Sequence, residues 1–275
     1  MRKTILLIVA LGFVCSLAYG DETAEIGLDT KDDSSSADKW EFIVTPYLWL
    51  PSVDAKATAD GTTQSLDLDF SDIIDTFDVF GLSSLFEARK GKWSLVFDFM
   101  YVDLDARFRN PVPILDKVGV HIEQTDFLFG VGYRLLELPL RQDTRFPALT
   151  FDLVGAGRYA YLKQKLTPKI SGGPSMKLGK SKDWVEPVIG GRFAFHLTDK
   201  VTCIVRGNIG GFGVGSASNK TWKFMTGFGY RFSKKYTLKL GYQIYDIDYN
   251  NGSGSDEFGL DGKFDGPWLG LSYHF

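Results

Sequence analysis

Apolar and polar residues alternate along many segments of this chain, and aromatic side chains recur at every second position. In 120–136 one face carries Phe127, Phe129 and Tyr133, while the other carries Asp126 and several glycines. A period of two places successive side chains on opposite faces of a β-strand. The pattern therefore predicts strands with one face in an apolar environment and the other face towards a polar interior.

The alternation, broken by turn residues, predicts ten antiparallel strands at about 40–50, 79–90, 92–105, 120–136, 148–165, 184–197, 200–214, 221–233, 235–249 and 264–275. Tight connections such as 90–92 and 233–234 alternate with long ones such as 106–119 and 166–183. Outer-membrane barrels have short periplasmic turns and longer extracellular loops. We therefore expect an all-β fold, a transmembrane antiparallel up-and-down β-barrel. Only the connection 137–147 is long for a periplasmic turn.

The connection 51–78 leaves the strand count open. Residues 65–70 (SLDLDF) alternate, and Asp60-Gly61 could form a hairpin turn before them. Twelve strands is therefore an alternative, and eight is another. Residues 71–78 could form a short helix capped by Ser71.

Three regions differ in composition. Residues 1–20 read as a secretory signal peptide, with a basic start, a short apolar core and small residues before Asp21. Residues 21–39 are acidic and Ser-rich, and we expect a disordered periplasmic leader. Residues 40–275 would form the barrel. No apolar stretch of 18 residues follows residue 20, which excludes a helical membrane protein.

The final segment alternates as well, with Leu269, Leu271, Tyr273 and Phe275 on one face. A terminal Phe on such a strand is typical of bacterial outer-membrane barrels, and Phe275 would be the signal for the barrel-assembly machinery. We expect the bacterial outer membrane as the location, with its lipids and lipopolysaccharide as partners, and a monomer. The chain has no basic block that would suggest nucleic acid.

A soluble β-sandwich is the competing fold, because it would also alternate. The solvent-exposed face of a sandwich would carry mostly Lys, Glu and Thr. The polar face here instead combines glycine with both basic and acidic residues. A charge on a lipid-facing position near the bilayer centre costs about 2–4 kcal/mol, so charges should sort to the lumen. The predicted lumen charge network is Asp98, Asp126, Asp152, Arg158, Glu186, Arg192, Arg206 and Lys223. These residues would either pair and plug the bore or line a narrow conduit or ligand cleft.

The search for catalytic or metal chemistry finds little. His121 and Glu123 share a strand face, but no Ser accompanies them at a suitable spacing, so we name no catalytic residue. No Cys/His cluster has metal-ligand spacing, and the GGFGVG stretch at 210–215 is followed by a strand rather than a helix. The acidic loop 246–261 is better explained by solvation than by Ca²⁺ binding. We therefore expect neither a metal nor a cofactor.

Several stretches together resemble a family of Gram-negative outer-membrane β-barrel proteins of uncharacterised function. They are PYLWLP (46–51), SDIID (71–75), EARKGKW (87–93), WVEPVIGGR (184–192) and GNIGGFGVGS (207–216), with the C-terminal Phe. Relatives usually have Asp where this chain has Asn208, so one inner-wall charge is missing. The resemblance implies the fold and the location.

The expected function is a structural role or a passive small-solute channel in the outer membrane. Two alternatives are an enzyme that modifies outer-membrane lipid and an adhesin or receptor that uses the loops 51–78, 166–183 and 250–263. We do not expect an enzyme, because no catalytic constellation accompanies the barrel pattern.

Overall fold

The computed structural model describes residues 39–59, 62–68, 78–112, 115–141, 144–175, 178–215, 217–254 and 257–275. These residues form an all-β structure, and no helix among them is long and apolar enough to cross a membrane. The strands are β1 (Glu41–Trp49), β2 (Ser52–Ala59), β3 (Thr62–Leu68), β4 (Asp78–Lys90), β5 (Trp93–Val112), β6 (Leu115–Arg141), β7 (Thr144–Ile170), β8 (Leu178–His196), β9 (Val201–Gly211), β10 (Lys220–Arg231), β11 (Tyr236–Asn251) and β12 (Phe258–His274).

Ten of the described strands close into a barrel. Consecutive strands pair antiparallel from β4 to β12, β1 pairs with β4, and β1 also pairs with β12 to close the ring. Closure removes the free edges that an open sheet would expose. The predicted antiparallel up-and-down barrel of ten strands is confirmed.

The segment after β1 forms a hairpin that pairs with the barrel but does not add two further strands to the closed ring. Towards its end β12 pairs with β1, and along its first half it pairs with β2 instead. The change occurs at Leu50–Pro51, where the Leu50 amide still donates to the Pro267 carbonyl at 3.0 Å. β3 then pairs only with β2. The turn Asp60-Gly61 and the helix expected at 71–78 fall outside the described residues, except that Asp78 begins β4.

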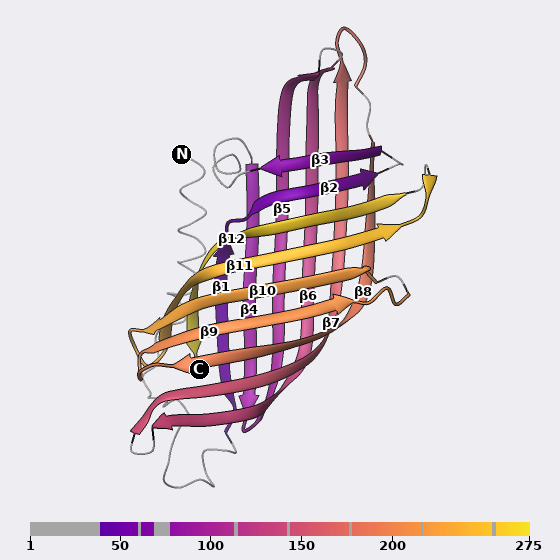
Figure 1. Cartoon of the computed structure of the whole chain (residues 1–275). Coiled ribbons are helices and arrows are strands. Elements are labelled where there is room, and N and C mark those ends of the chain that lie inside the picture. Colours follow the sequence, from indigo (N-terminus) through magenta and orange to yellow (C-terminus); the bar gives the residue numbers. More distant parts are fainter. Residues whose placement is uncertain are drawn as a thin grey trace.

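Three connections expected as loops are largely strand. Pairing of β5 with β6 continues to Val112↔Leu115, pairing of β6 with β7 to Arg141↔Thr144, and pairing of β7 with β8 to Leu166↔Leu178. The expected loops 106–119, 137–147 and 166–183 are therefore wrong. The alternation fades there because polar side chains occupy both faces, yet the backbone groups still need partners and a neighbouring strand supplies them. Figure 1 shows that β5 to β8 rise far beyond the other strands at one end, and that the hairpin of β6 and β7 protrudes at the opposite end.

The two ends of the barrel differ. The turn at 91–92, the turn at 197–200, the start of β1 and the last residue Phe275 lie at one end, called here the terminal end. The tall part of β5–β8 and the β2–β3 hairpin lie at the other, called here the far end (Figure 1). The hydrogen bond from the Leu50 amide to the Pro267 carbonyl and the pairing of β2 with β12 connect the hairpin to the barrel wall at the far end.

The outer surface carries a band of exposed apolar side chains around the barrel. Its members include Leu82, Trp93, Leu95, Phe127, Phe129, Val131, Leu153, Val185, Ile189, Phe193, Ile209, Phe224, Phe228, Tyr230, Leu238, Leu240 and Leu269. Beyond this band, towards the far end, the outward positions become polar, with Asp103, Glu123 and Lys163. A band this large and continuous needs an apolar surrounding.

The interior is filled in layers. The far end holds an apolar cluster in which Trp184 stacks on Tyr249 with ring centroids 4.0 Å apart, and Val53 and Ala55 of β2 join it. Charged side chains fill the middle, and a cavity lies at the terminal end. The β2–β3 hairpin therefore helps to cover the far-end core.

We expect Gly266→Ala to destabilise the barrel. A Cβ at Gly266 would lie 2.1 Å from the Leu50 carbonyl oxygen and 2.8 Å from the Pro51 Cα, and backbone atoms at the β1–β2 joint cannot give way cheaply. Overpacking of this kind costs about 1–3 kcal/mol. Gly155→Ala is the matched control, because a Cβ there meets nothing within 4 Å. Urea unfolding in detergent would measure both, and equal stabilities would contradict the tight joint.

Candidate functional site: the charged interior

Asp98 of β5 is the centre of one ion-pair group in the bore. Arg206 Nη2 lies 2.5 Å from Asp98 Oδ2, and Lys223 Nζ lies 3.3 Å from the same oxygen. The Tyr47 hydroxyl donates to Asp98 Oδ1 at 3.0 Å. Because β1, β5, β9 and β10 supply these groups, the contacts join strands that lie far apart around the barrel.

Glu186 of β8 is the centre of a second group of polar contacts. Arg158 Nη1 lies 2.7 Å from Glu186 Oε1, and both side chains are almost completely buried. Ser218 and Thr221 donate to Glu186 Oε2, the latter at 3.1 Å. The Arg158 guanidinium also donates to Asn208 Oδ1 at 2.6 Å, so the neutral residue at this position still serves as an acceptor.

Asp126 lies between these groups without an ion pair of its own among the described residues. It accepts hydrogen bonds from Gln124 at 2.8 Å and from the Tyr245 hydroxyl at 3.2 Å. Arg158 and Lys223 both approach the Tyr245 ring, at 5.6 and 6.0 Å from its centroid. The Tyr245 ring thus bridges the charged layer and the apolar cluster above it.

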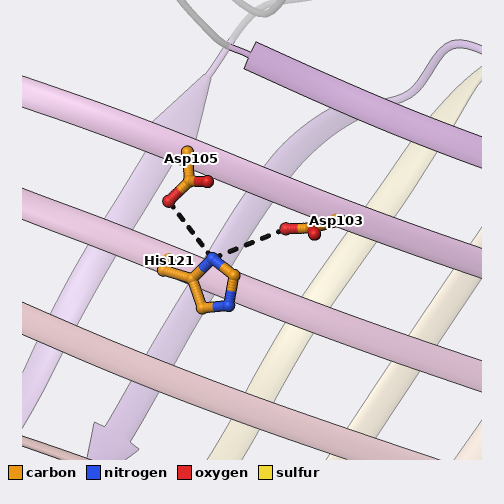
Figure 2. Close-up of side chains that lie close together, drawn as sticks. All are labelled: Asp103, Asp105 and His121. Carbon is orange, nitrogen blue, oxygen red and sulfur yellow. Dashed lines mark hydrogen bonds and ion pairs between the residues drawn. The ribbon is translucent and has the colours of Figure 1, made fainter.

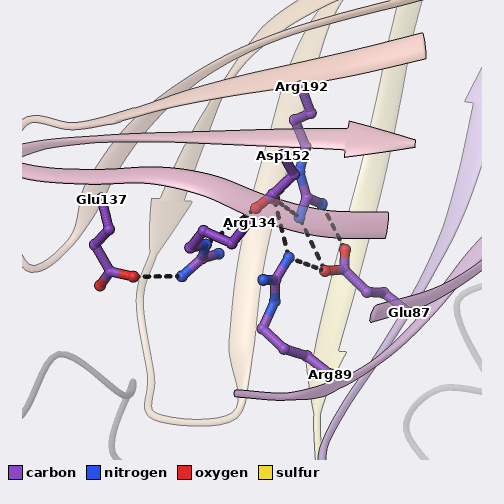
Figure 3. Close-up of polar contacts among 6 residues, drawn as sticks. All are labelled: Glu87, Arg89, Arg134, Glu137, Asp152 and Arg192. Atoms are coloured by element: carbon purple, nitrogen blue, oxygen red, sulfur yellow. Dashed lines mark hydrogen bonds and ion pairs between the residues drawn. The ribbon is translucent and has the colours of Figure 1, made fainter. Parts of the chain in front are cut away.

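A third group lies nearer the terminal end (Figure 3). Arg192 makes two hydrogen bonds to Glu87, at 2.5 and 2.9 Å, and contacts Asp152 at 2.6 Å. Arg89 Nη2 bridges the same two carboxylates, at 2.9 Å from each. Arg134 adds a contact to Asp152 at 3.0 Å. Arg134 also contacts Glu137 at 3.2 Å, so three carboxylates balance the three arginines of this group.

The structure places all eight residues predicted from the sequence in the interior, but at different depths. Seven take part in ion pairs, and Asp126 takes part through hydrogen bonds alone. Sequence reasoning missed Glu87, Arg89 and Arg134 as members of the network. Glu87 and Arg89 stand two apart on one strand, within the EARKGKW motif, and this spacing was the available signal.

The charged layer leaves almost no free space. Between Asp98, Asp126 and Lys223 a cavity of about 10 Å³ remains. A single water needs roughly 10–15 Å³. Above this layer the Trp184–Tyr249 stack and Phe258, whose exposure is 0%, close the bore again. Two successive barriers therefore separate the terminal-end cavity from the far end.

The terminal-end cavity has a volume of about 630 Å³. Its lining is rich in cations and poor in anions. The basic residues that line it are Lys39, Arg89, Lys92, Arg134, Arg192, Arg206, Arg231, Lys234 and Lys239, and the acidic residues are Glu41, Glu87 and Glu137. The cavity is thus an electropositive chamber, with Lys39 at its mouth.

A separate group lies on the outer face towards the far end. His121 Nδ1 on β6 lies 3.1 Å from Asp105 Oδ1 and 3.4 Å from Asp103 Oδ1 on β5 (Figure 2). The three ligand atoms lie within 4.8 Å of one another, so this set could hold a divalent cation, with waters completing the shell. The sequence search missed it because the two strands bring the residues together only through their register, Asp105↔His121.

The expected pairing of His121 with Glu123 is looser than the contact with the aspartates. His121 Nε2 lies 4.0 Å from Glu123 Oε2, whereas Lys163 Nζ lies 2.7 Å from that oxygen. The hydrogen bond from Lys163 lowers the pKa of Glu123 below its ordinary value. Glu123 therefore pairs mainly with Lys163, and the carboxylate that contacts the His121 ring most closely is that of Asp105, through Nδ1.

Comparisons with known proteins bear on the fold. No protein-family model and no curated protein matches the chain. Among solved structures, the outer membrane protease OmpT from Escherichia coli aligns over 90% of this chain and 100% of its own, with 8% identity and a TM-score of 0.53. This chain has the fold of an outer-membrane β-barrel. At this identity the likeness concerns the fold and not the activity.

Two further outer-membrane proteins align with lower TM-scores. Ail, the attachment invasion locus protein of Yersinia pestis, solved with the heparin analogue sucrose octasulfate, has 12% identity and a TM-score of 0.36, over 86% of this chain and 99% of its own. Neisserial surface protein A has 13% identity and a TM-score of 0.28, over 86% of this chain and 100% of its own.

We expect Arg158→Met to destabilise the protein strongly. The substitution leaves the Glu186 carboxylate buried without its cation, and such a loss costs about 3–5 kcal/mol. The double variant Arg158→Met/Glu186→Gln should recover much of this loss. Lys263→Met is the control, because its pair with Asp265 is about half exposed and contributes about 0–1 kcal/mol. The free energies of unfolding of these variants and of the wild type, measured in detergent, test the prediction. If Arg158→Met were as stable as the wild type, the result would contradict a stabilising buried pair.

Proposed function

We propose that this protein is an integral outer-membrane barrel with a closed bore, and that its role is structural rather than that of an open channel. The observation that carries the proposal is the double barrier inside the barrel: the paired charges around Asp98 and the apolar cluster around Trp184. A solute of ordinary size would have to break buried ion pairs and then displace a packed core. Both steps cost several kcal/mol.

The exposed apolar band supports the membrane location. It begins near Trp93, which packs against Tyr133, and its middle lies at the register pair Phe97↔Phe129. An outward apolar belt with aromatic residues at its border is what a bilayer requires of a barrel wall. The Asp98 group lies at the same depth on the inner face, where its charges are paired rather than solvated.

The orientation follows from the connections. The terminal end carries the tight turns, and outer-membrane barrels have their short turns on the periplasmic side. The cavity then opens to the periplasm, and the tall wall of β5–β8 stands outside the cell. Secretion of this chain across the inner membrane would depend on the expected signal peptide at residues 1–20.

A charge at the middle of the band should destabilise the protein, and the same charge beyond its border should not. We expect Phe129→Arg to cost about 2–4 kcal/mol in lipid, and Leu140→Arg about 0–1 kcal/mol. The two side chains are matched in exposure, at 52% and 53%. Unfolding in phospholipid vesicles, followed by Trp fluorescence, measures the difference. Equal costs would place the band in water and contradict the proposal.

A closed bore predicts that the protein does not conduct ions. Purified wild-type protein in a planar bilayer should give no discrete conductance steps, because paired charges and then the apolar cluster fill the bore. Heat-modifiable migration on gels would verify that the inserted protein is folded. Discrete steps from folded wild-type protein, lost or altered in Arg206→Ala, would overturn the structural role in favour of a conduit.

A second candidate function is recognition at the cell surface. The specific observation is the extension of β5–β8 beyond the apolar band, with outward side chains of both signs such as Asp103, His121 and Lys163. A rigid sheet is a precise platform for contacts. Shortening the β7–β8 hairpin by removing 167–177 should abolish a binding phenotype and leave heat-modifiable migration intact. Unaltered binding would exclude the β5–β8 wall as the binding surface.

A further inference from the structure

The terminal-end cavity has a defined mouth and a defined floor. Lys39, Lys92 and Lys234 stand at the mouth, among the turns of the terminal end. Arg206 and Trp268 contribute to the floor, beneath the charged layer. A volume of about 630 Å³ falls within the range of small-molecule sites. The chamber is therefore large enough to enclose a ligand and is accessible from one end only.

The ion pairs do not balance the basic lining. Glu87, Glu137 and Asp152 compensate the three arginines of the group in Figure 3, and Asp98 is shared by Arg206 and Lys223. Lys239 lines the cavity and makes no ion pair or hydrogen bond with any described residue. Together with the lysines at the mouth it leaves the chamber with surplus positive charge.

Glycines keep the space around Lys239 open. Its partners in the strand register are Gly229 on β10 and Gly270 on β12, so no side chain lies directly opposite Lys239 on either neighbouring strand. A Cβ at Gly229 would lie 3.6 Å from Lys239 Cγ. A lysine with bare glycine on both sides can reach a ligand without displacing protein atoms.

Arg89 offers a second unused donor. Its side chain is 10% exposed, and its Nη2 atom serves Glu87 and Asp152. Its Nη1 atom is buried and has no hydrogen-bond partner. Figure 3 shows this nitrogen turned away from the two carboxylates. A buried guanidinium nitrogen without a hydrogen-bond partner is destabilising, and an incoming anion would supply the missing acceptor.

The remaining lining is apolar. Ile43, Leu85, Met225 and Trp268 face the same chamber. We propose that the cavity is a binding site for small phosphate- or carboxylate-bearing anions that carry an apolar group. Arg89 and Lys239 contact the oxyanion, and the apolar wall contacts the rest of the ligand. Arginine suits this role because its planar fork matches two oxygens of a carboxylate or phosphate.

Such oxyanions have two sources. One is a free molecule that enters through the mouth. The other is the chain itself, because residues 21–38, which precede Lys39, contain seven acidic side chains and one basic side chain. Carboxylates tethered beside the mouth would compete at a high effective concentration. The experiment has an arm for each source.

Phenyl phosphate is the probe, titrated by calorimetry into the folded protein in neutral detergent. We expect saturable binding that weakens as salt is added, because the contacts are ionic. Lys239→Met should weaken binding about tenfold, which corresponds to about 1.4 kcal/mol. Lys239→Arg should restore it. Lys165→Met removes an exposed cation from the outer face and should leave binding unchanged. Absence of binding, or equal affinity in wild type and Lys239→Met, overturns the site.

Methyl phosphate tests the apolar wall, since it carries the same charge on a smaller group. We expect it to bind at least about tenfold more weakly than phenyl phosphate, given roughly 25 cal/mol for each Å² of apolar area buried. Equal affinities would overturn the apolar part of the proposal. Met225→Ser should reduce the difference between the two probes, because Met225 is part of the wall.

A chain that begins at Lys39 separates the two sources. Tighter phenyl phosphate binding than in the chain from Asp21 would show that residues 21–38 compete for the cavity, and unchanged affinity would assign the cavity to free anions; both results support the site. Loss of binding in the shortened chain would overturn it, because the ligand would then bind residues 21–38. Binding is independent of conduction, so a conducting barrel that binds phenyl phosphate refutes the structural role alone.

Discussion

The pairing of inward-facing charges across the bore is the interaction on which the rest of this structure depends. A barrel in an apolar surrounding must direct its ionisable side chains inward, where they meet one another in a space with little water. The Arg206–Asp98 contact joins β9 to β5 across the bore, and the Arg158–Glu186 contact joins the neighbouring strands β7 and β8. These ion pairs link the strands of the barrel and fill the middle of the bore. The bore is closed because of this filling.

The closed middle gives the two ends different environments. At the far end the β2–β3 hairpin covers an apolar core with Val53 and Ala55, so the wall of β5–β8 is supported from inside. At the terminal end the inward positions include Gly229 and Gly270, which carry no side chain, and a chamber lies there instead of a core. One barrel thus has a tall wall of four strands at one end and an electropositive cavity at the other.

Much of the fold could be predicted from the sequence, since a strand with lipid on one side must alternate. The aromatic face around Phe129 and the sorting of Asp98 and Arg158 to the other face both follow from that constraint. The strand ends could not be predicted, because beyond the apolar band the alternation disappears although backbone pairing continues, as it does from Leu166 to Leu178.

The sequence by itself determined the all-β barrel architecture, for which it favoured ten strands, and the inward direction of the eight predicted charged residues, because periodicity is a local property of the chain. Only the tertiary structure decided which charge meets which, that Asp103, Asp105 and His121 converge, and that Arg89 and Lys239 share a chamber. These contacts depend on register and on the curvature of the wall, which arise from all the strands together and leave no trace at any single position.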